Sequence, residues 1–458
     1  MALIEAVDPL LKLIPEVKAP EAPNALKIKL MWTGIVLILF YIMSEIPLIG
    51  LSTVSSQQLE ALQLLLASDI GTLISVGIGP IVLASIVLQL LVGAGIMQMD
   101  LTTSQGKARF TGLQKLLAII LSFFEAAAFS GFGAENVGFI HAMPGMYFVV
   151  VLQIALGSIL LLYLDEVVSK HGIGSGIGMF IAAGVASTFF WQVFRPPTAL
   201  DAGGRIFIFF QSLLAGQFSA MIVAISPVIF AIIIFLVVSF AEGMHINIPI
   251  SMGKAGVGGR FPVKFLYVSN MPVILAVALF ANVQLWAQIL GKIPFLGYLM
   301  EGLSWATRSP RLDGNLSLFE TIVLRGLSPL AVQEIFHAIV YMIVLLIVCV
   351  VFGKFWVELG GQGSTQMANQ LEKAGMQIPG FRRDPRIIKR VLDRYIPTLT
   401  ILGSLFVGLL AGFSDLTTAS LVSGTGVLLT VGIVYKLYEE LAKAQLMDMH
   451  PLLKRFLG

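Results

Sequence analysis

The sequence predicts an all-α polytopic membrane protein with ten transmembrane helices. Of its 458 residues, 57% are hydrophobic and 12% are charged, and the mean hydropathy is +0.91. Soluble domains carry about a quarter charged residues. Ten apolar stretches of about twenty residues run through the chain, and this is the length that crosses a bilayer as a helix. Because hydrocarbon offers no hydrogen-bond partners, and the stretches do not alternate as barrel strands do, we expect helices.

The ten spans follow one another along almost the whole chain. We expect them at residues 30–49, 70–93, 113–133, 146–164, 173–194, 219–240, 267–290, 335–357, 396–413 and 419–438. Residues 1–17 place apolar side chains on one helical face, which is typical of a short helix lying on the membrane surface, although Pro9 weakens this interpretation.

The distribution of positive charge sets the orientation of the spans. With ten spans, both termini lie on one side of the membrane. Of the 29 Lys and Arg residues, all but six fall on that side; the six are Arg195, Arg205, Lys292, Arg308, Arg311 and Arg325. Positive charge stays in the cytoplasm, so we expect both termini there.

The middles of the spans carry almost no ionisable groups, with Glu125 as the clear exception. A carrier coupled to ions needs charged groups at mid-depth to bind and release the ion. The composition therefore favours a passive passage. An ion-coupled carrier of small solutes that uses Glu125 stays open as an alternative, as does a membrane scaffold without any passage.

Two local features have both a structural and a functional interpretation. Residues 58–67 can form about three helical turns, which is too short to span; they form either an external surface helix or a segment that blocks a cavity. Spans two, five and ten are rich in glycine, which serves either close helix packing or an aliphatic constriction that excludes water by dewetting.

Two long cytoplasmic loops, 241–266 and 358–395, carry basic residues. They either anchor the protein near anionic lipid or dock a polyanion such as ribosomal RNA. The chain has no ATP-binding P-loop, no dinucleotide-binding spacing and no metal-ligand spacing among its five histidines. We therefore expect no cofactor, no metal and no enzymatic activity.

The ordered motifs of the chain resemble the SecY family, and in particular its archaeal members, the counterparts of the alpha subunit of the eukaryotic translocon. The motifs include GTLISVGIGPIV (71–82), LQLLVGAGIMQMDL (88–101), YLDEVVSKHGIGSGIGMFIAAGV (163–185), YVSNMPVILAVALFANVQLW (267–286), GFRR (380–383) and GTGVLLTVGIVYKLYEE (424–440). The resemblance covers nearly the whole chain. It implies the central subunit of the Sec translocase, a passive channel that moves unfolded polypeptides across the membrane and releases transmembrane segments sideways.

The resemblance also implies which residues form the channel. The hydrophobic pore ring would consist of Ile78, Val82, Ile177, Ile181, Ile274 and Leu429. The plug would be the segment of about 58–67, with Gln58, Leu59, Leu62, Leu65 and Leu66. The lateral gate would lie between spans two and three and spans seven and eight. Asn282 matches a polar gate position, whereas Leu83 stands where relatives often carry a polar residue such as Thr.

The family further implies the partners and the division of the chain. Ribosome docking would use Lys254, Arg260 and Lys264 in the first long loop and Arg382 and Arg383 in the second. Other partners would be a SecE/gamma subunit, a small beta subunit, signal sequences, nascent chains and membrane lipid, with no small-molecule substrate. We expect an N-terminal segment 1–29, inverted pseudo-symmetric halves at 30–194 and 195–440, a tail at 441–458, and a location in the plasma membrane.

Overall fold

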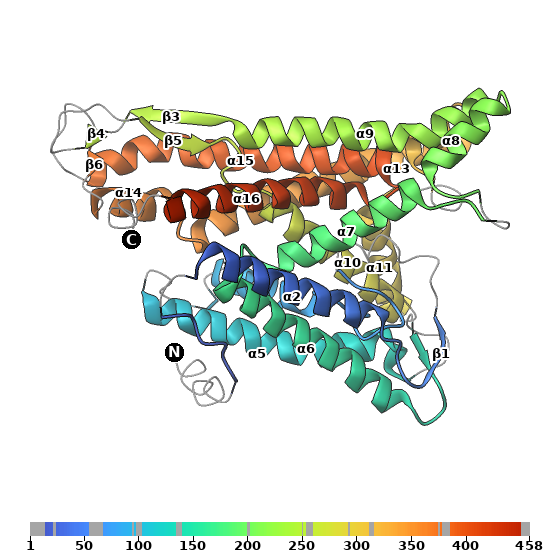
Figure 1. Ribbon diagram of the computed structural model, residues 1–458, viewed down its shortest axis with the longest axis horizontal. Helices are drawn as coiled ribbons and strands as arrows, with labels where there is room; N and C mark the ends of the chain where they lie inside the picture. The colour runs from blue at the N-terminus through green and yellow to red at the C-terminus, as the bar shows by residue number, and fades with distance from the viewer. Residues whose placement is uncertain are drawn as a thin grey trace.

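Ten helices of at least 15 residues correspond to the ten predicted spans (Figure 1). They are α2 (Leu26–Glu45), α4 (Gly79–Gly93), α5 (Ser104–Phe129), α6 (Tyr147–His171), α7 (Gly176–Phe194), α9 (Phe218–Gly243), α10 (Met271–Leu290), α13 (Pro329–Leu359), α15 (Pro385–Thr418) and α16 (Gly424–Met449). In the described part of the chain, seven helices are long and apolar enough to cross a membrane by length and composition. The predicted all-α membrane fold is confirmed.

The computed structural model describes the chain except residues 1–13, 22–23, 55–66, 94–95, 98–102, 134–139, 199–201, 250, 253–259, 292–293, 311–315, 374–375, 378–384 and 450–458. Residues 1–13 of the predicted interfacial helix, the plug residues 58–66 and the loop residues Lys254, Arg382 and Arg383 therefore lie outside the described residues, while residues 14–17 are described and contain no helix.

The second span differs from its prediction, because helix α4 begins at Gly79 rather than near residue 70. Gly71 and Gly77 have φ values of +98° and +60°, which no right-handed helix contains. The Leu73 N–H instead donates to the Ile46 carbonyl. The segment also packs closely on α6, since a Cβ at Gly157 would lie 1.8 Å from the Leu73 carbonyl oxygen. Non-helical backbone is tolerated at membrane depth where protein surrounds it, as here.

The helices form two groups that contact each other at two helix–helix interfaces. In Figure 1, α2, α5 and α6 lie in the lower group and α9, α13, α15 and α16 in the upper group, with α7 and α10 between them. Helix α7 packs against α16, and α4 packs against α10 and α13. Elements from the first and second parts of the sequence thus share one apolar core.

Several shorter elements were not predicted from the sequence. They are helices α8 (Arg205–Leu214), α11 (Pro294–Thr307), α12 (Leu318–Arg325) and α14 (Ser364–Lys373), the 3-10 turn η1 (Gly131–Gly133), and strands β1 (Leu51–Val54), β2 (Ile140–Ala142), β3 (His245–Pro249), β4 (Ser251–Met252), β5 (Arg260–Lys264) and β6 (Met376–Gln377). Strand β3 pairs antiparallel with β5, with His245 opposite Lys264. Strand β4 pairs with β6, and so joins the two long loops.

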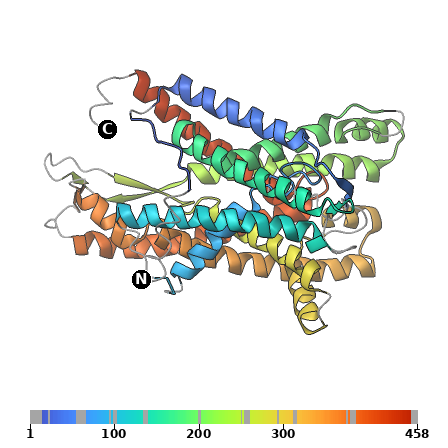
Figure 2. The same ribbon diagram turned by 90° about the horizontal axis from the view of Figure 1, so that it is seen from below.

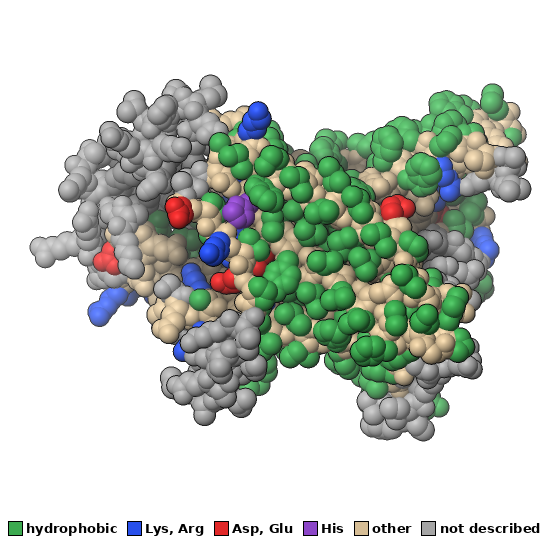
Figure 3. Space-filling model, turned by 60° about the horizontal axis from the view of Figure 1, so that its bottom comes forward, with side chains coloured by type: hydrophobic (Ala, Val, Ile, Leu, Met, Phe, Trp, Pro, Cys, Tyr) green, Lys and Arg blue, Asp and Glu red, His purple; other side chains and the backbone are tan. Residues whose placement is uncertain are grey.

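The short elements gather at the two ends of the molecule. Figure 2 shows the β3–β5 ribbon at the end of the molecule where α16 finishes, and helix α11, in yellow, projecting from the bundle. On the face shown in Figure 3, hydrophobic side chains cover a broad area between the ends, while charged side chains lie toward the ends of the molecule. This distribution is the one that a bilayer-spanning protein requires.

Candidate functional site

The six predicted ring residues come from four parts of the chain and share one apolar core. Ile78 directly precedes α4 and Val82 lies in its first turn; Ile177 and Ile181 lie on α7, Ile274 on α10 and Leu429 on α16. Ile78, Val82, Ile181 and Leu429 are buried in the largest hydrophobic cluster, and Ile177 and Ile274 pack against it half-buried. All six are aliphatic, so water that enters between them finds no polar side chain of the ring to bind.

Helices α7 and α16 run antiparallel in a register that sets the level of two ring residues. A Cβ at Gly178 would lie 3.6 Å from Ile433, and one at Gly426 would lie 2.9 Å from Val185. These two close approaches enclose Ile181 and Leu429 and bring them to nearly the same level. Gly426 allows this close packing, because a Cβ there would have to displace the Val185 side chain, whereas one at Gly178 would make ordinary contact with Ile433. Close helix packing is one of the two interpretations of the glycine pattern.

Asn270 joins the start of α10 to α16 beside the ring. Its buried side-chain amide donates to the Leu429 carbonyl at 3.5 Å. A Cβ at Gly432 would lie 1.7 Å from the Asn270 Nδ2 atom, so only glycine fits at that position. Because Ile274 lies one turn after Asn270, this contact fixes Ile274 relative to Leu429. Nothing in the sequence pattern singles out Asn270.

The predicted gate residues are buried on facing helices. Leu83 lies on α4 and Asn282 on α10, and α4 packs against both α10 and α13. The Asn282 amide donates to the Ala278 carbonyl of its own helix at 2.9 Å, while its Oδ1 atom has no hydrogen-bond partner among the described residues. Glu125 on α5 is also buried, with an Oε1 atom that lacks such a partner in the described part of the chain.

Lys264, one of the predicted docking residues, is held by an acidic side chain. Its Nζ atom lies 2.6 Å from both carboxylate oxygens of Glu439 on α16, and 5.7 Å from the centre of the Tyr435 ring. Arg260 begins strand β5, which pairs with β3 up to Lys264. The ion pair therefore attaches the base of this ribbon to α16, a contact that the spacing of the residues in the sequence does not reveal.

A second ionic cluster lies at the end of α6 and was also missed. The Glu166 Oε1 atom is 2.7 Å from Lys115 on α5 and 2.7 Å from Lys170 on its own helix. Lys115 and Glu166 are both buried, so their charges need compensation, which Lys115 receives from Glu166 and, at 3.7 Å, from the exposed Glu16. The Lys170 ammonium also donates to the Val17 carbonyl at 2.5 Å, which ties the N-terminal segment to this corner.

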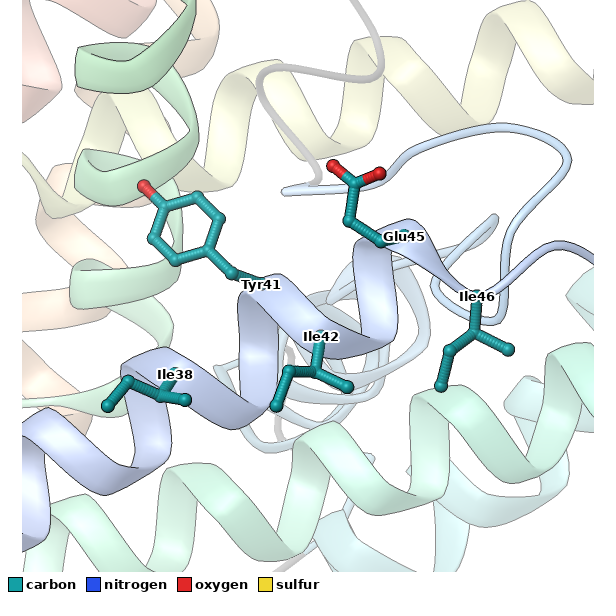
Figure 4. Close-up of a pocket in the computed structure, with 5 residues that line it drawn as sticks. All are labelled: Ile38, Tyr41, Ile42, Glu45 and Ile46. Carbon is teal, nitrogen blue, oxygen red and sulfur yellow. The ribbon is translucent and has the colours of Figure 1, made fainter.

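A groove of about 450 Å³ lies on the outer face of α2, away from the ring residues (Figure 4). It is lined by Ile38, Tyr41, Ile42, Glu45 and Ile46. Ile38 and Ile42 are exposed, and the Tyr41 hydroxyl donates to the Ala183 carbonyl of α7 at 3.0 Å. The groove thus belongs to the apolar outer surface rather than to the ring.

Family models match almost the whole chain. The model of the SecY family matches residues 72–438, and that of the plug domain of Sec61p matches residues 38–71. The chain belongs to the SecY family. A relative from Methanocaldococcus jannaschii, named protein translocase subunit SecY, is 46% identical and aligns over 98% of this chain and 99% of its own length. One of the same name from Methanothermobacter thermautotrophicus is 45% identical over 100% and 99%.

Solved structures of SecY-family channels share the fold. A structure of a protein conducting channel superposes with a TM-score of 0.81 at 44% identity, covering 97% of this chain and 99% of that one. Canine Sec61 from a ribosome-channel complex superposes with a TM-score of 0.78 at 44% identity, over 97% and 99%. Membership of this family confirms the predicted resemblance and a transport channel rather than an enzyme.

Proposed function

We propose that this chain is the channel-forming subunit of a protein translocase, through which unfolded polypeptides cross a membrane. Membership of the SecY family and the likeness to solved channel structures support a polypeptide channel. The observation that carries the proposal is the convergence of six aliphatic residues from α4, α7, α10 and α16 in one core, with Ile181 and Leu429 level on antiparallel helices. Such a collar excludes ions without any charge and widens when its helices move apart.

The resting conductance for ions tests the role of the ring. Replacing Ile181 and Leu429 by Ser in the assembled complex would place two hydroxyls in the collar and should raise the conductance of idle channels in planar bilayers. The matched control is Ile233→Ser on the exposed face of α9, which should leave the conductance unchanged. Equal conductance in the ring variant and the unmodified channel would remove the ring from its assigned role.

The sideways exit is the second part of the proposal. Helices α4 and α5 would part from α10 and α13 to open a path from the conduit to lipid. A segment at the gate would then partition by its transfer free energy, roughly −0.3 to −0.6 kcal/mol per central Leu, Ile, Phe or Val, against about +2.5 to +3.5 kcal/mol per Asp, Lys or Arg. Leu83 makes the closed α4 face apolar, and it leaves Asn282 without a hydroxyl at that position.

The plug is proposed from the match of residues 38–71 to the plug domain of Sec61p. The short segment of about 58–67 would fill the external side of the conduit while no chain crosses. On both sides of it the chain is anchored: β1 pairs with β2, and the turn from Asp69 to Ser75 is held by backbone hydrogen bonds. The proposed plug therefore lies between two segments of the chain that are fixed in the structure.

Ribosomes and further subunits are the proposed partners. Canine Sec61, a structural neighbour of this chain, was solved in a ribosome-channel complex. By analogy, the loops at 241–266 and 358–395 would dock on ribosomal RNA through Arg260, Arg382 and Arg383, because phosphate contacts by basic side chains drive such binding. A SecE/gamma subunit and a small beta subunit would complete a heterotrimer.

The protein spans a membrane several times, and we further propose its location and orientation. The excess of Lys and Arg on one side favours cytoplasmic termini in the plasma membrane. A cysteine added after residue 458 should react with an impermeant maleimide only after the cells are opened. Labelling of intact cells at that position would reverse the orientation.

A further inference from the structure

Helix α7, which carries Ile177 and Ile181 of the ring, has its first turn held by a carboxylate from the preceding helix. Its own N-cap residue, Ser175, makes no side-chain capping hydrogen bond. Instead, the Ile177 N–H donates to the Asp165 Oδ1 atom of α6 at 2.9 Å. The free N–H groups of a helix start need such acceptors, and a negative charge there also favours the helix dipole.

Helix α16, which carries Leu429, begins in the same way. The Thr425 N–H donates to the Asp415 Oδ1 atom of the preceding helix α15 at 2.8 Å, and the Thr425 hydroxyl donates to Oδ2 of the same carboxylate. Asp415 is buried. In both cases a carboxylate ten to twelve residues upstream caps the first turn of the helix that follows.

Close backbone packing accompanies both caps. A Cβ at Gly176 would lie 2.5 Å from the Asp165 Cα atom, and a Cβ at Gly424 would lie 2.0 Å from the Ser414 carbonyl carbon. Each helix therefore starts directly against the helix before it, at a position where only glycine fits. The carboxylate and the glycine together fix the position of the helix start relative to the preceding helix.

The two caps lie on opposite sides of the level at which Ile181 and Leu429 meet. Helices α7 and α16 are antiparallel, as the approaches of Gly178 to Ile433 and of Gly426 to Val185 show, so their starts point in opposite directions. The cap of α7 holds the N–H of the ring residue Ile177 itself. The cap of α16 lies about one turn before Leu429.

The second cap also reaches a helix of the proposed gate. The Tyr341 hydroxyl of α13 donates to the Asp415 Oδ2 atom at 2.7 Å, and the Tyr341 ring stands edge-on to Phe280 of α10, with centroids 6.2 Å apart. A displacement of α13 during gate opening would therefore pull on the carboxylate that fixes the start of α16.

We propose that Asp165 and Asp415 are a matched pair of positioning residues, which fix α7 and α16 from opposite ends so that Ile177, Ile181 and Leu429 meet as a seal. This inference rests on the proposed function of the ring. Neither carboxylate touches a crossing chain; each acts through the helix that it caps. Asp415 additionally links the seal to α13 through Tyr341.

The test is the resting ion conductance of the assembled complex in planar bilayers, alongside its thermal unfolding. An N-cap contributes about 1 kcal/mol, so Asp165→Ala should raise the idle conductance roughly fivefold. Asp165→Asn keeps an acceptor oxygen of nearly equal capping strength and should restore a low conductance. An Asn variant as leaky as the Ala variant would overturn the capping role, because it would show that the charge alone matters.

For the second cap, Asp415→Ala should raise the conductance, and Tyr341→Phe, which removes one of its hydrogen bonds and keeps the ring, should raise it less. If the Asp415→Ala complex does not assemble, the role of the second cap is tested by comparing the conductance of Tyr341→Phe with that of a control variant. The matched control is Thr400→Val on α15, which removes a buried hydroxyl that, among the described residues, donates to the Ile396 carbonyl of its own helix. A Tyr341→Phe conductance equal to that of the control would overturn the link to α13.

A ring variant separates failure of this inference from failure of the proposed function. Should Ile181→Ser leak while both Asp→Ala variants stay tight and folded, the ring stands and the carboxylates are not its positioning residues. Should Ile181→Ser stay tight as well, the ring itself is wrong, and the role of the caps falls with it.

Discussion

The side chain of Asn270 occupies the space that any side chain at Gly432 would need. A Cβ built on Gly432 would lie 1.7 Å from the Asn270 Nδ2 atom, and the same amide donates to the Leu429 carbonyl three residues earlier in α16. The start of α10 and the middle of α16 are thereby fixed against each other beside the ring. Several consequences of this kind of packing can be measured.

Gly432→Ala should displace Asn270 and separate α10 from α16. Overpacking of this kind costs about 1–3 kcal/mol, so we expect a lower melting temperature together with a higher resting conductance. Adding Asn270→Ala to the same chain removes the clashing amide. The loss of stability in the double variant should therefore be smaller than the sum of the losses in the two single variants. Strict additivity of the two substitutions would contradict the contact.

Lys264 should matter less for ribosome binding than Arg382, because Glu439 already compensates its charge. We expect Arg382→Glu to weaken binding of the complex to ribosomes by roughly tenfold, with a steep dependence on salt. Lys264→Ala should weaken it less. Exchange of the pair as Lys264→Glu with Glu439→Lys should recover most of any loss; a loss in Lys264→Ala as large as in Arg382→Glu would contradict the anchoring role.

Glu125→Gln should leave translocation of a secretory substrate intact. The amide has the same size as the carboxyl group, and a passive conduit has no step that requires a proton to move at that depth. The measurement is protease protection of a translocated substrate in proteoliposomes. Loss of transport in a correctly folded Glu125→Gln channel would instead favour the ion-coupled carrier.

Glu166→Ala should be among the most destabilising single substitutions in α6, because Glu166 is buried and paired. It would leave Lys115 buried with the exposed Glu16 carboxylate, 3.7 Å away, as its remaining counter-charge among the described residues. Breaking a buried pair costs about 3–5 kcal/mol, and we expect a loss near the lower end of that range. Thermal unfolding of the detergent-solubilised complex measures the loss of stability. Lys115→Met with Glu166→Leu, which removes both charges, should recover most of it, and a stability as low as that of the single variant would argue against the pair.

Deletion of residues 58–67 should yield a folded protein with a leakier idle state, because the proposed plug would be gone while the ring remains. The conductance of idle channels should rise, and crosslinking of a signal sequence should persist. A shuffled segment of the same composition is the matched control for length. An unchanged leak after deletion would remove the segment from its assigned role.

Much of the fold followed from hydropathy, because a helix that crosses hydrocarbon must be long and apolar over its whole length. The start of α4 did not follow, since the sequence around Gly71 and Gly77 is as apolar as the helix after it. Packing of residues 71–78 against α6 and α2 keeps this segment out of the helix, and hydropathy does not record such contacts. The β3–β5 ribbon was missed for the opposite reason: its pairing is set by register between strands, not by composition.

The residues proposed for the site depended on the resemblance to a family rather than on the pattern alone. Aliphatic residues such as Ile78 and Leu429 are indistinguishable in sequence from dozens of core neighbours. The residues that position them, Asn270, Asp165 and Asp415, were missed because each acts on a helix that only the fold brings near. A capping carboxylate from the preceding helix leaves no signal at the usual N-cap position.

Site-specific crosslinking of a stalled, half-translocated polypeptide tests the central claim most directly. A photoreactive residue placed in turn at Ile78, Val82, Ile177, Ile181, Ile274 and Leu429 should crosslink to the crossing chain, and one at the outward-facing Ile233 should crosslink to lipid. Crosslinks from the six positions to lipid alone, with the polypeptide captured elsewhere, would contradict the account.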